Sequence, residues 1–256
     1  SPLSGTIRKH IKDPGLIHLL EFPALFLGAT ASQIPALYSL MNYADLCLGT
    51  WYPIGGMYKI IEAMYAIARE QGVKFSPGSE VSGFKFGTRG ITSLTANGNE
   101  VNTDIVVASA DYHHVEQQLL PKALRRYSDS YWERRKMAPS SILFYLGINK
   151  PLSGLLHHNL FFDEDFERHA LDIYQEPRWP EKPLFYVCCP SKTDSTVAPA
   201  GCENVFILIP TASGLEDDET IREHYYNLVI SRLETLTRQA IRSHVIFKKS
   251  YAHRDF

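Results

Sequence analysis

Residues 51–56 combine residue types that suit contact with a flat apolar molecule. The segment joins two aromatic residues, a proline and two adjacent glycines, in the order Trp51, Tyr52, Pro53, Ile54, Gly55 and Gly56. The glycine pair predicts a tight turn that carries no side chains. An extended apolar ligand could pass close to the backbone there and lie against the aromatic rings. We therefore predict a substrate-binding segment, with a helix-start turn and a core tryptophan as the competing interpretation.

Histidine and cysteine are the other residue types in this chain that could carry chemistry. The histidines include two adjacent pairs, and the chain has four cysteines: His113, His114, His157, His158, Cys47, Cys188, Cys189 and Cys202. Neighbouring residues rarely bind one ion, no Cys-x-x-Cys pair occurs, and no carboxylate stands at ligand spacing. We predict no metal site. The histidines are expected to be hydrogen-bonded or exposed, and the cysteines to be reduced and mostly buried thiols.

Two aromatic-rich segments predict strands that could line a cavity. They contain the residues Phe144, Tyr145 and Phe185. Successive side chains of a strand point to opposite faces, so only one member of the 144–145 pair can face a cavity. The alternative is that both faces of these strands are simply packed.

The composition of the chain is that of an ordinary globular protein. It has 256 residues, of which 45% are hydrophobic, 21% are charged and 12% are aromatic, with a net charge of −2. This length allows one large domain or two smaller ones. The charge balance gives no indication of the basic face that a nucleic-acid partner requires. No apolar run is long enough to span a bilayer. The first residue is Ser1 and the last follows a strand-like stretch, so we expect a piece of a longer protein.

Hydrophobic periodicity predicts helices in the first part and strands after them. Helices are expected within residues 6–27 (starting at Asp13-Pro14), 35–43, 57–71, 112–137 (broken at Pro121) and 218–243. Strands are expected at residues 73–75, 81–86, 90–96, 105–108, 141–148, 159–162, 183–190, 204–210 and 245–251. Asn97-Gly98 predicts a hairpin turn. Together these indicate a mixed α/β (α+β) fold with an antiparallel sheet in the C-terminal half.

Several motifs occur in an order that resembles bacterial phytoene desaturases and related carotenoid desaturases. They are Phe22 to Gly28, Pro35 to Leu40, Gly49 to Met57, Val106 to Asp111, Thr193 to Gly201 and Arg254 to Phe256. The segment 193–201 matches that family's T-D-x-x-x-A-P-x-G pattern. The resemblance covers nearly the whole chain.

The resemblance implies an FAD flavoprotein related to amine oxidases. It places Glu80 and Val81 beside the adenine and Ser109, Ala110 and Asp111 beside the cofactor. The family's G-x-G-x-x-G segment for the pyrophosphate is absent from this sequence. We therefore expect a partial FAD-binding Rossmann-like domain at residues 57–137, interleaved with a substrate domain. The latter consists of a helical substrate or membrane-contact part at 1–56 and an antiparallel sheet covered by helices at 138–256.

The function implied by the resemblance is FAD-dependent desaturation of a phytoene-like polyene by hydride transfer to the flavin, with oxygen or a quinone as the electron acceptor. Such an enzyme would be cytoplasmic and peripheral on a membrane surface, with residues 16–31 as the expected contact. A buried core helix is the alternative interpretation of that segment. The alternative functions are desaturation of a hydroxylated carotenoid, a retinol-saturase-like flavoenzyme, and a non-enzymatic carotenoid- or lipid-binding module.

Overall fold

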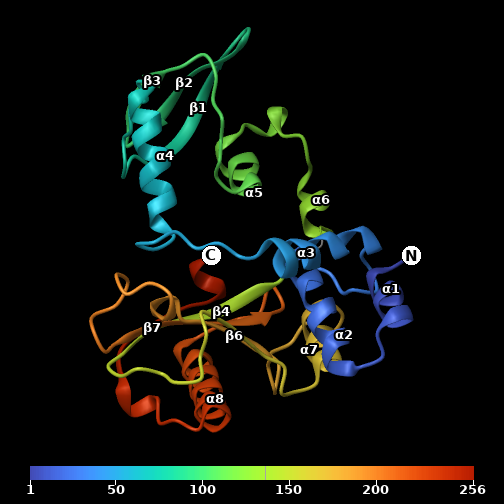
Figure 1. Cartoon of the computed structure of the whole chain (residues 1–256). Coiled ribbons are helices and arrows are strands. Elements are labelled where there is room, and N and C mark those ends of the chain that lie inside the picture. Colours follow the sequence, from blue (N-terminus) through green and yellow to red (C-terminus); the bar gives the residue numbers. More distant parts are fainter. Residues whose placement is uncertain (136) are drawn as a thin grey trace. The chain divides into compact units, whose positions relative to one another are not determined.

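The computed structural model describes residues 1–135 and 137–256, except for the side chains of residues 25 and 26. The chain divides into two compact units, one formed by residues 1–64 and 137–256 and the other by residues 65–136. The helical part predicted at 1–56 and the sheet part predicted at 138–256 therefore lie in the same unit (Figure 1). Helix α4, Tyr58–Glu70, confirms the helix predicted at 57–71 and spans the division between the units.

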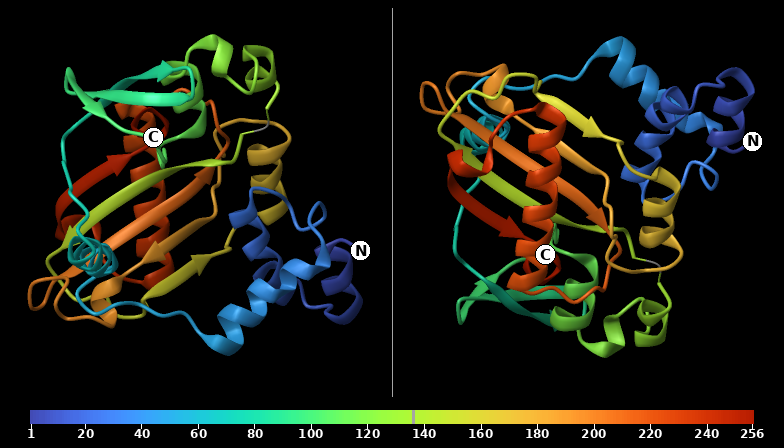
Figure 2. Two further views of the ribbon diagram at one scale, coloured as in Figure 1. Left: turned by 90° about the horizontal axis from the view of Figure 1, so that it is seen from above. Right: turned by 90° about the horizontal axis from the view of Figure 1, so that it is seen from below.

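A five-stranded sheet forms the centre of the larger unit. Its strands are β4 (Ser140–Ile148), β5 (His158–Phe161), β6 (Phe185–Cys188), β7 (Glu203–Thr211) and β8 (Val245–Tyr251). The order is β5-β6-β7-β4-β8, and every neighbouring pair is antiparallel. Helix α8, Glu219–Thr237, crosses one face of this sheet (Figure 2). An antiparallel sheet can bury one face and leave the other open, and this sheet does so.

The face beneath α8 is the main hydrophobic core. Alternate residues of β4 and β7 point into it, and Phe144 is only 1% exposed. The ring of Phe144 meets that of Tyr226 of α8 at 5.7 Å between centroids. Val229 and Leu233 of the same helix are fully buried. The period-2 pattern of the strands is therefore matched by one apolar side of the helix.

Replacing Phe144 by alanine is expected to cost about 3–5 kcal/mol of unfolding free energy, because it leaves a cavity in this core. The neighbouring Tyr145 is 42% exposed on the opposite face. Its replacement by alanine should cost about 1 kcal/mol, the scale of an exposed aromatic contact. Urea unfolding of both variants measures the difference. Equal losses of stability would contradict the assignment of the two faces.

Short helices precede the sheet in the chain. They are α1 (Leu3–His10), α2 (Pro14–Glu21), a 3₁₀ turn (Phe22–Leu27), a 3₁₀ turn (Ala36–Tyr38), α3 (Ser39–Tyr43) and a π turn (Ala44–Leu48). The side chain of Asp13 caps α2 by accepting from the Leu16 N–H at 2.9 Å, with Pro14 in the first turn. This confirms the predicted helix start, since Asp before Pro satisfies a free N–H and pre-sets the first helical residue.

Helix α7, Phe166–Tyr174, was not predicted from the sequence and joins these helices to the sheet. Its Phe166 ring stacks on His18 of α2 at 5.0 Å. Arg8 of α1 pairs with Glu21 at 3.0 Å and with Glu167 of α7 at 3.3 Å. The remaining short turns of this unit are 3₁₀ segments at Pro190–Lys192, Arg242–His244 and His253–Asp255.

His169 fixes α7 to the sheet through both ring nitrogens. Its Nε2 lies 2.9 Å from the Pro210 carbonyl, and its Nδ1 accepts from the Leu184 N–H at 3.0 Å. This pattern requires the neutral ring with the proton on Nε2. Burial lowers the pKa of His169, although the Pro210 carbonyl acts in the opposite direction.

The stability of the larger unit is therefore expected to fall as the pH drops below about 6.5, the pKa of an unfolded histidine. Below that pH the unfolded chain takes up a proton that folded His169 does not. Unfolding midpoints between pH 7.5 and pH 5 test this, with an NMR titration of the His169 ring. A His169 ring that titrates at or above pH 6.5 would contradict it.

The smaller unit contains a three-stranded antiparallel sheet. Its strands are β1 (Val81–Gly87), β2 (Gly90–Ala96) and β3 (Asn99–Asn102). The predicted hairpin is confirmed, because Asn97 and Gly98 both have positive φ angles, 47° and 76°. Its short helical segments are α5 (Tyr112–His114), a π turn (Val115–Leu119), a 3₁₀ turn (Lys122–Leu124) and α6 (Asp129–Glu133).

Two strands predicted for this unit are not formed. Residues 73–75 and 105–108 have no strand assignment, and Ile105 and Val107 are exposed. A run that is apolar on both faces becomes a strand only when other strands pair with it. Within the described residues of this unit, the sheet consists of β1, β2 and β3 alone, so the apolar run at 105–108 has no pairing partner.

Candidate functional site

The open face of the five-stranded sheet is lined mainly by aromatic and aliphatic side chains. Strand pairing sets two rows across it, each with one residue from every strand. The first row is His158, Cys188, Phe206, Tyr145 and Lys249, and the second is Leu160, Tyr186, Leu208, Leu143 and Tyr251. We call these two rows the open face.

The aromatic rings of the open face touch one another in a continuous strip. The ring of Tyr145 lies 5.1 Å from that of Phe206 and 5.8 Å from that of Tyr251. Phe206 in turn lies 6.2 Å from Tyr186. These separations are those of interacting aromatic pairs. The strip crosses four neighbouring strands, and its neighbouring rings are tilted or edge-on to one another.

Two residues predicted to line the substrate cavity belong to the core instead. Phe144 lies beneath α8, and Phe185 is 2% exposed, stacked on Phe161 at 4.6 Å. Both point away from the open face, since they alternate with Tyr145 and Tyr186 along their strands. Of the three predicted aromatic residues, Tyr145 is the one on the open face.

The glycine end of the predicted segment 51–56 is hydrogen-bonded within the larger unit, which also contains the open face. The Gly55 N–H donates to the carboxylate of Asp194 at 2.6 Å. The Tyr52 ring packs edge-on against His157, with ring centroids 4.6 Å apart. Trp51 is 88% exposed and makes no contribution to a core. The competing interpretation of a core tryptophan is therefore wrong.

The turn itself requires glycine backbone geometry. Gly55 and Gly56 have φ angles of 91° and 97°, which L-residues with a side chain rarely adopt. A Cβ at Gly56 would lie 3.6 Å from the Tyr52 hydroxyl and 3.7 Å from Val197. Residues 51–56 thus pass directly beside the loop 193–197 of the T-D-x-x-x-A-P-x-G motif.

Asp194 is the residue that joins these two segments. It is 2% exposed, and its other carboxylate oxygen accepts from the N–H and the hydroxyl of Thr196 at 2.9 and 2.6 Å. Hydrogen bonds from Thr196 and Gly55 hold the pKa of Asp194 below its usual range. Sequence reasoning found the motif but missed this role, which only the pairing with Gly55 reveals.

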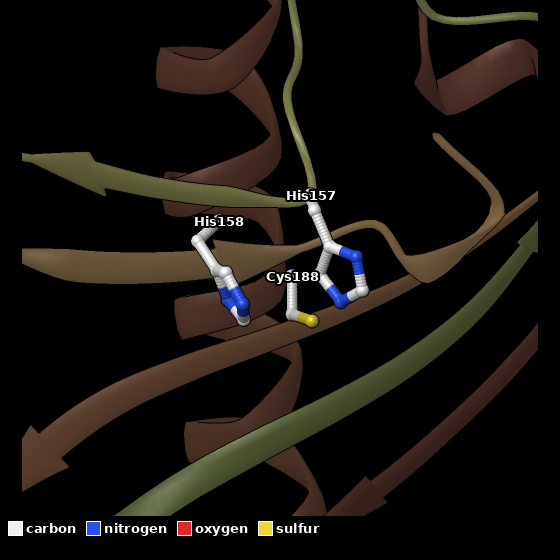
Figure 3. A group of neighbouring side chains, drawn as sticks. All are labelled: His157, His158 and Cys188. Carbon is white, nitrogen blue, oxygen red and sulfur yellow. The ribbon is translucent and has the colours of Figure 1, made fainter. Parts of the chain in front are cut away.

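A cluster of two histidines and a cysteine lies at the β5 end of the open face (Figure 3). His157 Nδ1 lies 2.6 Å from the Thr193 hydroxyl, and His158 Nδ1 lies 2.5 Å from the Tyr186 hydroxyl. Burial, and then the neighbouring His158, lower the pKa of His157. Burial also raises the pKa of the Cys188 thiol, against a hydrogen bond with Tyr186. The sequence gives no spacing signal for this cluster, because strand pairing brings Cys188 opposite His158.

The residues predicted to contact the cofactor lie in the smaller unit. Glu80 precedes β1, where its backbone is held by Asn97, and Val81 is the first residue of that strand. Ser109 and Ala110 lie in the irregular segment before α5. Asp111 caps α5 by accepting from the His114 N–H at 2.8 Å. Helix capping is thus one established role for Asp111.

The larger and smaller units together match one family model. The model describes flavin-containing amine oxidoreductases and matches residues 2–238. The chain therefore belongs to the family of flavin-containing amine oxidoreductases. Its mixed helix and antiparallel-sheet structure agrees with the fold of that family.

Within this family, the chain is similar to carotenoid desaturases. It is 36% identical to a carotenoid 3,4-desaturase of Haloarcula japonica over 99% of this chain and 52% of that protein. It is 34% identical to a zeta-carotene-forming phytoene desaturase of Myxococcus xanthus over 80% of this chain and 39% of that protein. The chain thus spans about half the length, or less, of these relatives. The resemblance to carotenoid desaturases drawn from the motifs is confirmed.

Solved structures support the fold. An oxidoreductase from Methanosarcina mazei superposes with a TM-score of 0.66 at 18% identity, over 98% of this chain and 56% of the other. A Rab GDI from Plasmodium falciparum gives a TM-score of 0.56 at 14% identity, over 98% of this chain and 50% of the other. At these identities the likeness concerns the fold alone.

No helix among the described residues combines the length and the apolar character needed to cross a bilayer.

Proposed function

We propose that this region is the substrate-binding part of an FAD-dependent carotenoid desaturase that acts on a phytoene-like polyene. The observation that carries the proposal is the aromatic strip on the open face of the sheet. Together with the desaturase relatives, it supports a long, flat, apolar substrate. The oxidoreductase class follows from the family.

The dimensions and charge of the open face suit such a substrate. Five strands spaced about 4.8 Å apart give roughly 19 Å from the first strand to the last. Of the residues in the two rows, Lys249 alone carries a full charge at neutral pH, and it lies on the edge strand β8. A polyene laid across the strands would bury its surface against rings and aliphatic side chains, which the hydrophobic effect favours.

The smaller unit fits one part of an FAD site. Among the described strands β1 is an edge strand that pairs with β2 on one side, and an edge strand is a place where a ligand can meet backbone groups. Val81 opens this strand, consistent with the adenine contact that the resemblance implies. The glycine-rich segment for the pyrophosphate is not in the sequence. We propose that chain outside these 256 residues supplies it.

The residues of this chain would contribute to the reaction by binding and orienting the substrate. When bound, the flavin supplies the acceptor for the hydride that leaves one carbon of the polyene. The open face and segment 51–56 would hold the chain of the polyene in one register and keep water from it. The proton that leaves the neighbouring carbon would pass to a basic group of the assembled site, which completes the new double bond. Oxygen or a quinone would reoxidise the flavin.

We also propose a peripheral membrane contact, which brings the enzyme to its apolar substrate. In segment 16–31, Ile17, Ala24 and Ala31 are buried, whereas Leu16 and Leu19 are exposed. Leu20 of the same segment packs against the small core of this region. The side chain of Phe26 lies outside the described residues.

Exposed leucines continue beyond that segment, on the short helices at 36–48. They are Leu37, Leu40, Leu46 and Leu48. A Leu40→Glu, Leu46→Glu double variant should float less with anionic liposomes than the wild type, because it places two charges on the apolar side. Leu236→Glu on α8 is the control. Equal flotation of all three proteins would exclude this surface as the membrane contact.

Product formation tests the proposed reaction. The full-length protein, loaded with FAD and mixed with phytoene in liposomes, should give products with longer conjugation and absorption at longer wavelength. A protein that binds FAD but transforms only a hydroxylated carotenoid or retinol would point to the alternative flavoenzymes. One that binds the polyene and never FAD would be a carotenoid-binding module.

A further inference from the structure

We infer that His157, His158 and Cys188 form a binding site for a single Zn²⁺-type ion at the β5 end of the open face. One nitrogen of each imidazole and the thiol sulfur all lie within 4.8 Å of one another. Two ligands of one tetrahedral zinc ion are roughly 3.3–3.6 Å apart, given the usual Zn–N and Zn–S bond lengths. Small rotations of the side chains therefore suffice to close the site. The inference does not depend on the proposed desaturase activity.

The backbone explains why two neighbouring histidines converge. Residues inside a regular strand alternate between faces, which argues against two adjacent ligands. His157, however, precedes β5, and its carbonyl accepts from the Cys189 N–H at 2.8 Å. The two imidazole rings consequently lie on one side, 4.4 Å apart and tilted by 34°. Cys188 pairs directly with His158, and its side chain lies beside the two rings (Figure 3).

The Nδ1 atoms of both rings make the hydrogen bonds that the second nitrogen of a metal-binding histidine usually makes. The Nδ1 atoms of His157 and His158 are hydrogen-bonded to the hydroxyls of Thr193 and Tyr186. Donation from Nδ1 to a hydroxyl leaves the Nε2 lone pair for a metal ion. The Nε2 atom of His157 is buried and has no hydrogen-bond partner in the described structure. A buried nitrogen without a partner is costly, and a metal ion would satisfy it.

The chemistry of the ligands selects the class of ion. Two imidazoles and one thiolate favour Zn²⁺ and its analogue Co²⁺ over Mg²⁺ or Ca²⁺, which prefer oxygen ligands. Cys188 is a thiol before binding, and its proton leaves to solvent as the sulfur–metal bond forms. Three protein ligands leave a fourth position for water or for an oxygen atom of another ligand.

Cobalt titration of the untagged protein, after removal of metals with a chelator, tests the site. We expect one Co²⁺ per chain, with visible bands of a tetrahedral ion and a near-ultraviolet charge-transfer band from thiolate to cobalt. Added Zn²⁺ should remove both. Cys188→Ser should lose the charge-transfer band, and His157→Ala should weaken binding by at least about a hundredfold, beyond the 10–100-fold effect of a supporting residue.

Matched variants keep the experiment decisive. Cys202→Ser and His113→Ala change the same residue types outside the cluster and should bind like the wild type. His158→Gln, at an exposed position, replaces one ligand without opening a core. The inference is overturned if the wild type shows no charge-transfer band, or if the band persists in Cys188→Ser.

Discussion

Replacing Phe206 by aspartate is expected to lower polyene desaturation by the full-length enzyme at least a hundredfold. Phe206 lies in the middle of the aromatic strip, between Tyr145 and Tyr186. A carboxylate there would have to be covered by the apolar substrate without a partner. Burying an unpaired charge costs several kcal/mol, and each 1.4 kcal/mol is a factor of ten in binding or rate.

The matching control for Phe206→Asp is Leu236→Asp. Leu236 is also apolar and partly exposed, but it lies on α8, which covers the opposite face of the sheet. This variant should retain the activity of the wild type. Steady-state rates of both variants with phytoene in liposomes, together with thermal unfolding to confirm folding, measure the effect. Equal activity of Phe206→Asp and the wild type would show that the substrate does not lie on the open face.

Replacing Asp194 by alanine is expected to produce the second large effect, a loss of about a hundredfold in kcat. Asp194 holds Gly55 and the loop residue Thr196 at the same time. Without the carboxylate, segment 51–56 is no longer fixed beside loop 193–197. A displacement of about 1 Å in residues that position a substrate can cost about a hundredfold in rate.

Asp194→Asn separates the loss of position from the loss of charge. The amide oxygen of asparagine can still accept one of these hydrogen bonds, so this variant should recover a large part of the activity. Because the substrate surface of the sheet stays intact, the KM of Asp194→Ala should change far less than its kcat. A KM that rises as much as kcat falls would indicate a contribution to substrate binding in place of positioning.

Local signals in the sequence predicted the elements that local chemistry dictates. Asp13 before Pro14 marked the start of α2, and Asn97-Gly98 marked the hairpin between β2 and β3. Aromatic and β-branched content predicted the strands of the larger sheet, and in β4, β6 and β7 alternate residues are buried. In these places the interactions that stabilise the element are made by residues close in sequence to the signal.

Features that depend on distant pairing could not be predicted in this way. The run at 105–108 is apolar enough for a buried strand but has no strand beside it in the described part of the smaller unit. Alternation showed that Phe144 and Tyr145 face opposite ways, yet it could not say which face α8 would cover. His158 and Cys188 are thirty positions apart in sequence, and only the pairing of β5 with β6 brings them together.

The most direct test of the account is the visible spectrum of the FAD-loaded full-length protein, recorded without oxygen before and after phytoene is added. We predict that phytoene bleaches the flavin spectrum in the wild type and leaves it unchanged in Phe206→Asp, because reduction requires the polyene to lie on the open face. A bound flavin that stays oxidised in the presence of phytoene would contradict the proposal that this protein desaturates a carotene.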